Sequence, residues 1–322
     1  MTKTTPCLLA TTLLMLGLAA APARASCNPP FCTPTFSHTY VSAAGGSDGN
    51  SCGFGAPCRN FQRAHDQTND QGVITVLDPG DFGLLTITKS INIMNDGGGE
   101  ASIVVKGGAT GITVNGGAGA YVNLRGLIIQ GVGPGTGLVF NTGFSLTMEN
   151  CVVRNLTSDG IDFEPSGNSN LSVSNTLVAD NGGVGILIAP TGSGSVKAIL
   201  SRVEAYNNSA SGIAVLGNFS TGTINTTVVD SVAANNALSG YGVSGMTATA
   251  NLVVVRSVSA NNTQIGLNAQ GAKGTLRVGQ SVVTGNATSW VANNGATLQS
   301  YADNKIDGNG DGSPTPFEIT KK

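Results

Sequence analysis

An internal repeat of about 25 residues restricts the fold of this chain more than any other feature. A glycine followed by an aliphatic residue recurs along the chain, and successive glycines lie 23 to 30 residues apart. A second set of aliphatic residues, called the aliphatic column here, recurs alongside the glycines at intervals of 24 to 29 residues. The glycine column comprises Gly111-Ile112, Gly137-Leu138, Gly160-Ile161, Gly185-Ile186, Gly212-Ile213, Gly242-Val243 and Gly266-Leu267, and the aliphatic column comprises Val152, Leu177, Val203, Val232, Val258, Val282 and Ile306. Two columns in step predict stacked repeats.

Each repeat is predicted to contain three short strands. After one of the glycines, Ile161 and Phe163 alternate with polar residues, and an alternation of period two places the apolar pair on one face of a strand. Stretches rich in Asn and Gly, such as residues 180–183, separate the strands as turns. The chain has 46 Gly against only 10 Phe, 5 Tyr and 1 Trp, a composition that favours strands and turns over helices.

A repeat of this length cannot bury its apolar face alone, whereas stacked coils can, because each strand pairs with its counterpart above and below. The sequence therefore predicts an all-β fold, a three-sided parallel β-solenoid of about nine coils over residues 73–322, with both columns pointing inward. The open end of such a stack invites aggregation. We expect a short helix within residues 57–70, with Phe61, Ala64 and His65 on one face, to cap the first coil.

The first 25 residues have the pattern of a secretory signal peptide. Lys3 provides the positive start, residues 8–20 the apolar run, and residues 23–25 the small-x-small cleavage pattern. We expect a secreted, periplasmic or cell-surface protein with no membrane span in the mature chain. The formal net charge of -2 gives no concentrated basic face, so nucleic acid is not an expected partner.

Four cysteines cluster in the segment 26–72 that precedes the predicted solenoid. An exported protein meets an oxidising compartment, so Cys27, Cys32, Cys52 and Cys58 are predicted to form two disulfides. Three connectivities are open, and we favour the sequential one, Cys27–Cys32 with Cys52–Cys58. The remaining Cys151 is interpreted as a small buried apolar residue.

The start of the repeat region resembles that of secreted bacterial β-helix repeat proteins. Residues 40–59 read YVSAAGGSDGNSCGFGAPCR and residues 73–80 read VITVLDPG. Over residues 38–320 the chain is similar to the right-handed parallel β-helix superfamily, which includes pectate lyases and polygalacturonases. The resemblance, with the general crossover rule, implies a right-handed solenoid, but it implies no particular activity.

The resemblance also implies that a substrate groove runs along one strand face. On the strands of the glycine column, only one coil carries carboxylates. Asp162 and Glu164 share a face and lie roughly 7 Å apart by strand rise, a separation suited to acid–base chemistry on a glycosidic bond. Asp159 lies close by, and residues 158–162, SDGID, look like part of a polygalacturonase motif. These three residues are the candidate catalytic group.

The next coil departs from that family pattern. Residues 181–183 read NGG where polygalacturonases carry an Asp pair, and the histidines His38 and His65 both lie outside the repeats. No complete catalytic set is present, so the sequence leaves open whether the protein is an enzyme.

A second candidate site lies near the C-terminus and would bind calcium. Oxygen-bearing side chains recur there at the positions that an EF-hand loop uses as ligands. The predicted ligands are Asp307, Asn309, Asp311, Ser313 through its carbonyl, and Glu318. No other cofactor is expected.

Two functional hypotheses remain. The first is a non-enzymatic exported β-helix that serves as a structural or glycan-binding surface, with a polysaccharide or an envelope component as partner. The alternative is a polysaccharide lyase or glycoside hydrolase that acts through Asp162 and Glu164.

Overall fold

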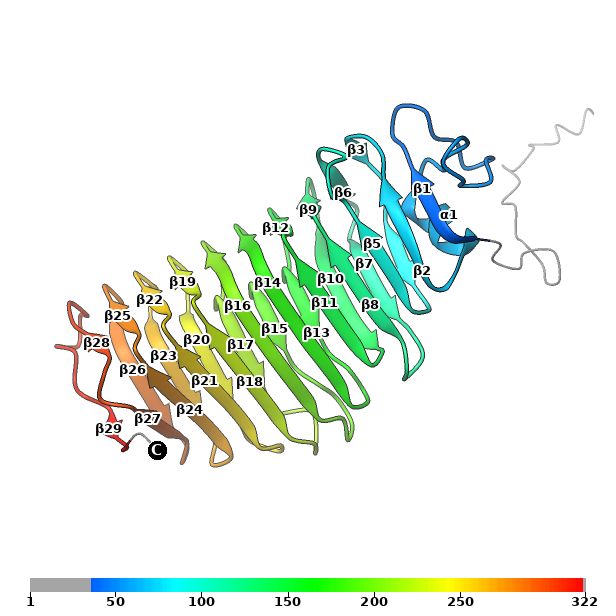
Figure 1. The fold of residues 1–322 in the computed structure, drawn as a ribbon. Helices are drawn as coiled ribbons and strands as arrows, with labels where there is room; N and C mark the ends of the chain where they lie inside the picture. The colour runs from blue at the N-terminus through cyan, green and yellow to red at the C-terminus, as the bar shows by residue number, and fades with distance from the viewer. Residues whose placement is uncertain (1–35, 321–322) are drawn as a thin grey trace, which may run out of the picture. The chain divides into compact units, whose positions relative to one another are not determined.

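Residues 36–320, the part of the chain that the computed structural model describes, wind into stacked coils (Figure 1). One side of the stack is a nine-stranded parallel sheet, called sheet 1 here. The other two sides belong to one 20-stranded sheet, whose two arms are called sheet 2a and sheet 2b. The nine strands of sheet 1 confirm the predicted solenoid of about nine coils.

Neighbouring strands pair in parallel with the equivalent strand of the next coil. Strands β14 (Ser169–Ala179) and β16 (Val196–Tyr206) run through both arms of the larger sheet, and β1 (Phe36–Val41) pairs with β2 ahead of the first coil. Sheet 1 comprises β4 (Leu85–Ile87), β7 (Ala109–Asn115), β10 (Gly135–Thr142), β13 (Ile161–Phe163), β15 (Ile186–Ile188), β17 (Ile213–Leu216), β20 (Ser239–Ser244), β23 (Ile265–Gln270) and β26 (Thr288–Asn293). The remaining strands of sheet 2a are β2 (Thr68–Val76), β5 (Ile91–Met94), β8 (Tyr121–Arg125), β11 (Ser145–Glu149), β18 (Ile224–Val229), β21 (Ala250–Val255), β24 (Gly274–Gly279), β27 (Thr297–Ser300) and β29 (Phe317–Glu318). Those of sheet 2b are β3 (Gly80–Asp81), β6 (Ala101–Val105), β9 (Leu127–Gly131), β12 (Val152–Arg154), β19 (Val232–Ala234), β22 (Val258–Ala260), β25 (Val282–Thr284) and β28 (Lys305–Ile306).

A column glycine stands at or near the start of seven of the nine described strands of sheet 1, from β7 to β23, where successive coils approach each other closely. A Cβ added to Gly137 would lie 2.2 Å from the carbonyl oxygen of Gly160, one coil further along. The repeat needs glycine here because no side chain fits between the coils. One predicted member was wrong: Gly242 pairs with Ala214, and Gly240 with the inward Tyr241 takes the column position.

Five of the seven residues of the predicted aliphatic column do not face the interior, namely Val152, Leu177, Val232, Val258 and Val282. Val152 pairs with Leu177, and both are half-buried on the outside, whereas the following residues Val153 and Val178 are fully buried. Residues such as Asn150 adopt a positive φ at the corner between sheets 2a and 2b, which changes the direction of the chain just before the column. For these five the inward residue therefore comes one position later than predicted.

The other two members face the interior, as predicted. Val203 is fully buried in the core, and Ile306 pairs with the buried Val283 and packs against the core.

A buried asparagine ladder runs along the opposite corner, between sheet 2b and sheet 1. Each member follows a residue of positive φ, as Asn208 follows Asn207, and directs its side chain inward. The side-chain amide of each asparagine donates to the side-chain oxygen of the next at 2.9 to 3.0 Å. The ladder comprises Asn181, Asn208, Asn236, Asn262, Asn286 and Asn309. It fixes the register of six successive coils.

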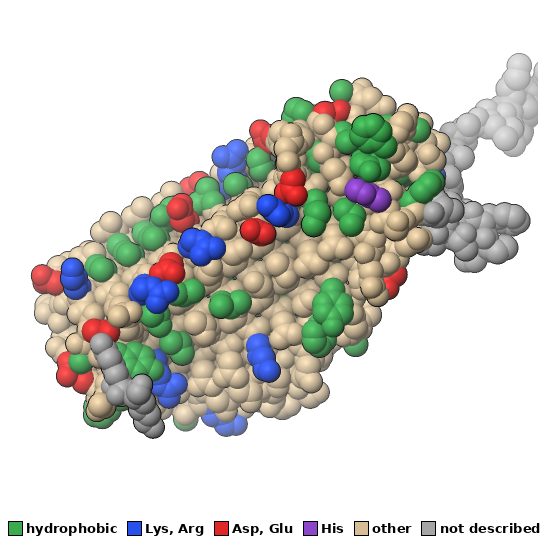
Figure 2. Space-filling model, in the orientation of Figure 1, with side chains coloured by type: hydrophobic (Ala, Val, Ile, Leu, Met, Phe, Trp, Pro, Cys, Tyr) green, Lys and Arg blue, Asp and Glu red, His purple; other side chains and the backbone are tan. Residues whose placement is uncertain are grey.

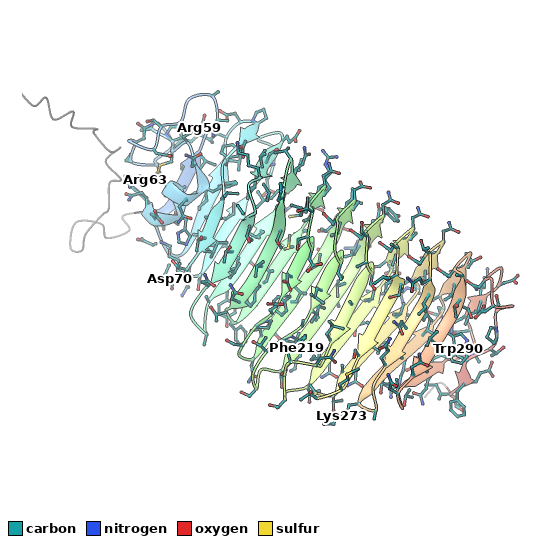
Figure 3. All side chains as sticks on the ribbon, turned by 180° about the vertical axis from the view of Figure 1, so that it is seen from behind. Arg59, Arg63, Asp70, Phe219, Lys273 and Trp290 are labelled. Atoms are coloured by element: carbon teal, nitrogen blue, oxygen red, sulfur yellow. A yellow bond between two sulfur atoms is a disulfide. The ribbon has the colours of Figure 1, made fainter. Side chains whose placement is uncertain are left out.

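Helix α1 (Phe61–Gln67) covers the first edge of sheet 1, as predicted for the cap. It buries Phe61, Ala64 and His65. The side chain of Gln62 accepts a hydrogen bond from the backbone N–H of Thr86 at 2.8 Å, so the edge strand β4 does not leave that donor free. Arg59 and Arg63 mark this end of the stack, and Trp290 lies toward the other end (Figure 3).

The Cys52–Cys58 disulfide is present, as predicted, and Cys151 is free and buried. Burial raises the pKa of the Cys151 thiol to about 11, which fits a packing residue. Residues 1–25, Cys27 and Cys32 lie outside the described residues, so the signal peptide and the second disulfide stay predictions. Within the described range, no helix is long and apolar enough to cross a bilayer.

Candidate functional site

Asp162 stands on the outer face of sheet 1 between two aliphatic side chains. On β13 it pairs in register with Val139 of β10 on one side and with Leu187 of β15 on the other. The carboxylate is half-buried, and its Oδ1 atom is shielded from solvent without a hydrogen-bond partner among the described residues. The neighbours therefore remove water from the Oδ1 atom without providing a hydrogen bond in its place.

Burial raises the pKa of Asp162 to about 7, and the nearby charges of Glu164 and Asp159 act in the same direction. The structure thus brings together the three predicted carboxylates. A hydrogen bond with the Glu164 side chain also contributes to the raised pKa of Asp162.

Asp162 and Glu164 lie two residues apart and alternate with buried residues, so both stand on the outer side of the coil, as predicted. Glycosidases hold their two carboxyls at least ~5 Å apart on opposite sides of the scissile bond. The catalytic role of Asp159, Asp162 and Glu164 stays a prediction.

Asp159 is held by the neighbouring coil. Its Oδ1 accepts a hydrogen bond from the backbone N–H of Val184 at 2.5 Å. A Cβ at Gly183 would lie 2.1 Å from the same oxygen, so the glycine makes room for this contact. Asp159 thus joins two turns, which is a structural role independent of any ligand.

Further along the same face lies a shallow hollow of about 190 Å³. It forms where Ala214 and Gly242 supply little or no side chain, and Leu216, Ser244 and Gln270 border it. The sequence analysis assigned Gly242 to the glycine column, whereas Gly242 stands on the outer face in register with Ala214. The sequence analysis did not find the hollow for this reason, and the sequence signal for it is the inward Tyr241 between two glycines.

Sheet 1 carries no basic side chain. None of its nine described strands contains Lys or Arg, and Asp162 is the one acidic residue within them. The polar groups that do face outward are amides and hydroxyls, including Thr113, Asn141 and Asn268. A polyanion would meet no counter-charge on these strands.

The residues of the predicted calcium site have other partners. The side-chain oxygen of Asn309 ends the asparagine ladder, where it accepts from the amide of Asn286 at 2.9 Å. Asp311 accepts from the backbone N–H and the hydroxyl of Ser289, and its pKa is lowered, burial being outweighed by these hydrogen bonds. Glu318 lies on β29, which pairs with β27. Among the described residues, no group of three or more His, Cys, Asp or Glu is arranged to hold a metal.

The coil geometry is shared with known proteins. A family model described as the right handed beta helix region matches residues 75–232. The chain is a right-handed parallel β-helix protein. No curated protein sequence matches this β-helix chain.

Two solved structures have the same fold as this β-helix protein. Pectate lyase Pel9A is 19% identical, with a TM-score of 0.66 over 82% of this chain and 74% of its own. A rhamnogalacturonan lyase is 14% identical, with a TM-score of 0.57 over 87% of this chain and 88% of its own. These similarities confirm the predicted resemblance in fold. At such low sequence identity they do not identify any active-site residue in this chain.

Proposed function

We propose that this β-helix is a secreted, non-enzymatic glycan-binding protein and that it binds a neutral polysaccharide along the outer face of sheet 1. The observation that carries the proposal is the absence of Lys and Arg from the nine described strands of that sheet. A neutral sugar chain needs hydroxyl and amide partners and some apolar surface, and this face offers these without a cation.

The hollow beside Gly242 and the aliphatic side chains Val139 and Leu187 give the face its shape. Leu187, Ala214 and Gly242 stand in register on successive coils. At ~4.8 Å per coil they run from the carboxyl group of Asp162 to the hollow over roughly 14 Å. A short stretch of an extended polysaccharide fits this length.

The decisive experiment measures binding and cleavage side by side. We expect the purified protein to be retarded in gels that contain a neutral polysaccharide and to release neither reducing ends nor unsaturated products. Leu187→Glu puts a charge in the middle of the face and should abolish the retardation. Val132→Glu, at an exposed residue outside the strands, is the matched control and should not.

One observation favours a second candidate function, hydrolysis of a glycosidic bond. A carboxyl whose pKa is about 7, as for Asp162, can donate a proton at neutral pH. Release of reducing ends that Asp162→Asn abolishes would establish this function and overturn the non-enzymatic one.

A further inference from the structure

The outer face of sheet 2b carries a repeated row of aliphatic side chains. Figure 1 places β9 to β25 along one long edge of the stack, and Figure 2 shows hydrophobic side chains along that edge, beside a row of charged ones. One outward residue from each of seven successive coils forms what is called the first column here, and the residue two positions later forms the second column. The first column is aliphatic and half-buried in six coils and contains the exposed Glu204 in the other one. Its aliphatic members are Ile128, Val152, Leu177, Val232, Val258 and Val282.

The outer face of the neighbouring sheet 2a is different. Its outward residues in register on three successive coils, Asn123, Thr147 and Ser172, are polar. Strand formation alone therefore does not require an aliphatic residue at an outward position. Apolar side chains aligned over several coils are stabilised when a partner removes them from water, so the first column has the composition of a contact surface.

The two columns contain one charge of each sign. Arg154 belongs to the second column on β12, and Glu204 belongs to the first column on β16. The strand between them is β14, which contributes Leu177 and Ala179 to the two columns. Arg154 donates to the side-chain oxygen of Gln130, and neither charge has an ion-pair partner within 4.0 Å in the described part of the chain. The face therefore presents two opposite, unpaired charges placed symmetrically about β14.

We propose that the outer face of sheet 2b binds the same face of a second copy of this chain. A two-fold axis perpendicular to the face, between Leu177 and Ala179, reverses both the order of the coils and the order of the two columns. It therefore places Arg154 of each copy opposite Glu204 of the other, so that the dimer contains this ion pair twice. A surface that meets itself about a two-fold axis is the commonest arrangement of homodimers.

The same axis matches the sizes of the facing side chains. Leu177 of one copy faces Ala179 of the other, and Ile128, two coils before β14, faces Ala234, two coils after it. A large side chain thus meets a small one at these positions. Two sheets whose facing side chains interdigitate in this way pack about 10 Å apart with their strands aligned.

A hollow of about 630 Å³ runs along the first column, and Val152, Leu177 and Val232 line it. In the dimer it receives long side chains from the second column of the other copy. Tyr206 of that copy faces Val152, and its Gln130 faces Val232. The hollow and the side chains that fill it thus belong to one surface, as a self-complementary contact requires.

The length of the first column sets the strength that we expect. It spans six coil steps, or roughly 29 Å at ~4.8 Å each, and the face is two outward side chains wide. Such a strip is smaller than the interface of a stable, permanent dimer. We therefore expect a reversible dimer with a Kd in the micromolar range.

The test is analytical ultracentrifugation of the purified protein over a wide range of concentrations. Arg154→Glu and Glu204→Arg each turn both ion pairs of the dimer into like-charge pairs, so each should raise the Kd by about 100-fold or more. An equimolar mixture of these two variants forms both pairs again in a heterodimer and should dimerise. The double variant Arg154→Glu with Glu204→Arg also restores both pairs and should dimerise by itself.

The aliphatic contact is tested separately. Leu177→Glu places a charge next to the two-fold axis and should abolish the dimer. Ile199→Glu is the matched control, because Ile199 is a 48% exposed aliphatic residue on sheet 2a, and this variant should dimerise as the wild type. Far-ultraviolet dichroism establishes that each variant retains the fold. In dilute solution, where the protein is monomeric, variants at the exposed Glu204 should melt at the temperature of the wild type.

Three outcomes overturn the proposal. The first is a protein that stays monomeric at every concentration. The second is a dimer that neither charge reversal weakens, or that the mixture of the two variants fails to restore. The third is a dimer that Leu187→Glu abolishes and Leu177→Glu does not, which would place the contact on sheet 1.

Discussion

The side-chain amide of Asn262 donates a hydrogen bond to the side-chain oxygen of Asn286, one coil further along, over 2.9 Å. The same amide also donates to the backbone carbonyl of Ala233 at 3.1 Å. The four inner ladder members, Asn208, Asn236, Asn262 and Asn286, each satisfy a buried backbone acceptor and the next side chain at once. Because the side chains are sealed from water, the arrangement holds the coils in one register.

Asn236→Ala should destabilise the protein strongly. Asn236 is fully buried, and its removal takes away the acceptor of the Asn208 backbone N–H and of one side-chain N–H of Asn208, as well as the donor to the carbonyl of Ala205. Each buried polar group left unpaired costs about 1–3 kcal/mol, which should lower the urea midpoint markedly. Asn225→Ala removes an exposed ladder bond of 3.0 Å and should change stability by less than ~0.5 kcal/mol. Equal midpoints for the two variants would contradict the role of the buried ladder.

Gly137→Ala tests the close approach of the coils at the glycine column. The added methyl group would lie 2.2 Å from the carbonyl oxygen of Gly160, so the coils must move apart. We expect a loss of about 1–3 kcal/mol in thermal or denaturant unfolding, as for other overpacked sites. Gly167→Ala is the matched control, since nothing lies within 4 Å of its new Cβ. A Gly137→Ala protein as stable as this control would show that the column is not sterically required.

The raised pKa of Asp162 makes folding pH-dependent. Its pKa is about 7 in the folded protein against an ordinary value of 3.8, so the folded state retains a proton that the unfolded state loses. The contribution of this group to stability is present in full below pH 3.8 and is lost as the pH rises toward about 7. Asp162→Asn should therefore gain in melting temperature over the wild type at pH 8 and lose that advantage at pH 3.

The control for this pH profile is Glu204→Gln, which removes an exposed carboxylate from the outer face of β16. Its melting temperature should follow the wild type across the range. If Asp162→Asn also follows the wild type at every pH, the carboxyl of Asp162 is ordinarily ionised in the folded protein, and its proposed shielding by Val139 and Leu187 is wrong.

Calcium binding at residues 307–318 is tested by calorimetry on the folded protein. The amide oxygen of Asn309 and the carboxylate of Asp311 already accept hydrogen bonds from Asn286 and Ser289. We therefore expect neither heat on titration with calcium nor a rise in melting temperature. A calcium-dependent stabilisation that Asp307→Asn abolishes would contradict this expectation and support the ligand set predicted from the sequence.

The fold was predictable from the sequence because the glycine column reflects a steric requirement that recurs in seven successive coils. It was harder to predict which aliphatic residues point into the core and which point outward. Val152 and Val153 are both apolar, and only the positive φ of Asn150 decides which of them points inward. The asparagine ladder has a sequence signal that was overlooked, an Asn, Asp or Gly followed directly by the inward Asn.

The candidate site was predictable in its residues but not in its geometry. The alternation along residues 160–164 places Asp162 and Glu164 on the outside, and the structure has them there. That Val139 and Leu187 flank Asp162 depends on the register between coils, which a single sequence does not contain.

Helix α1 occupies the first edge of sheet 1, while each later coil rests only on its immediate neighbours. A whole coil can therefore be gained or lost in the middle of the chain without disturbing helix α1 at the first edge. The length of this protein can thus change in evolution in units of one coil.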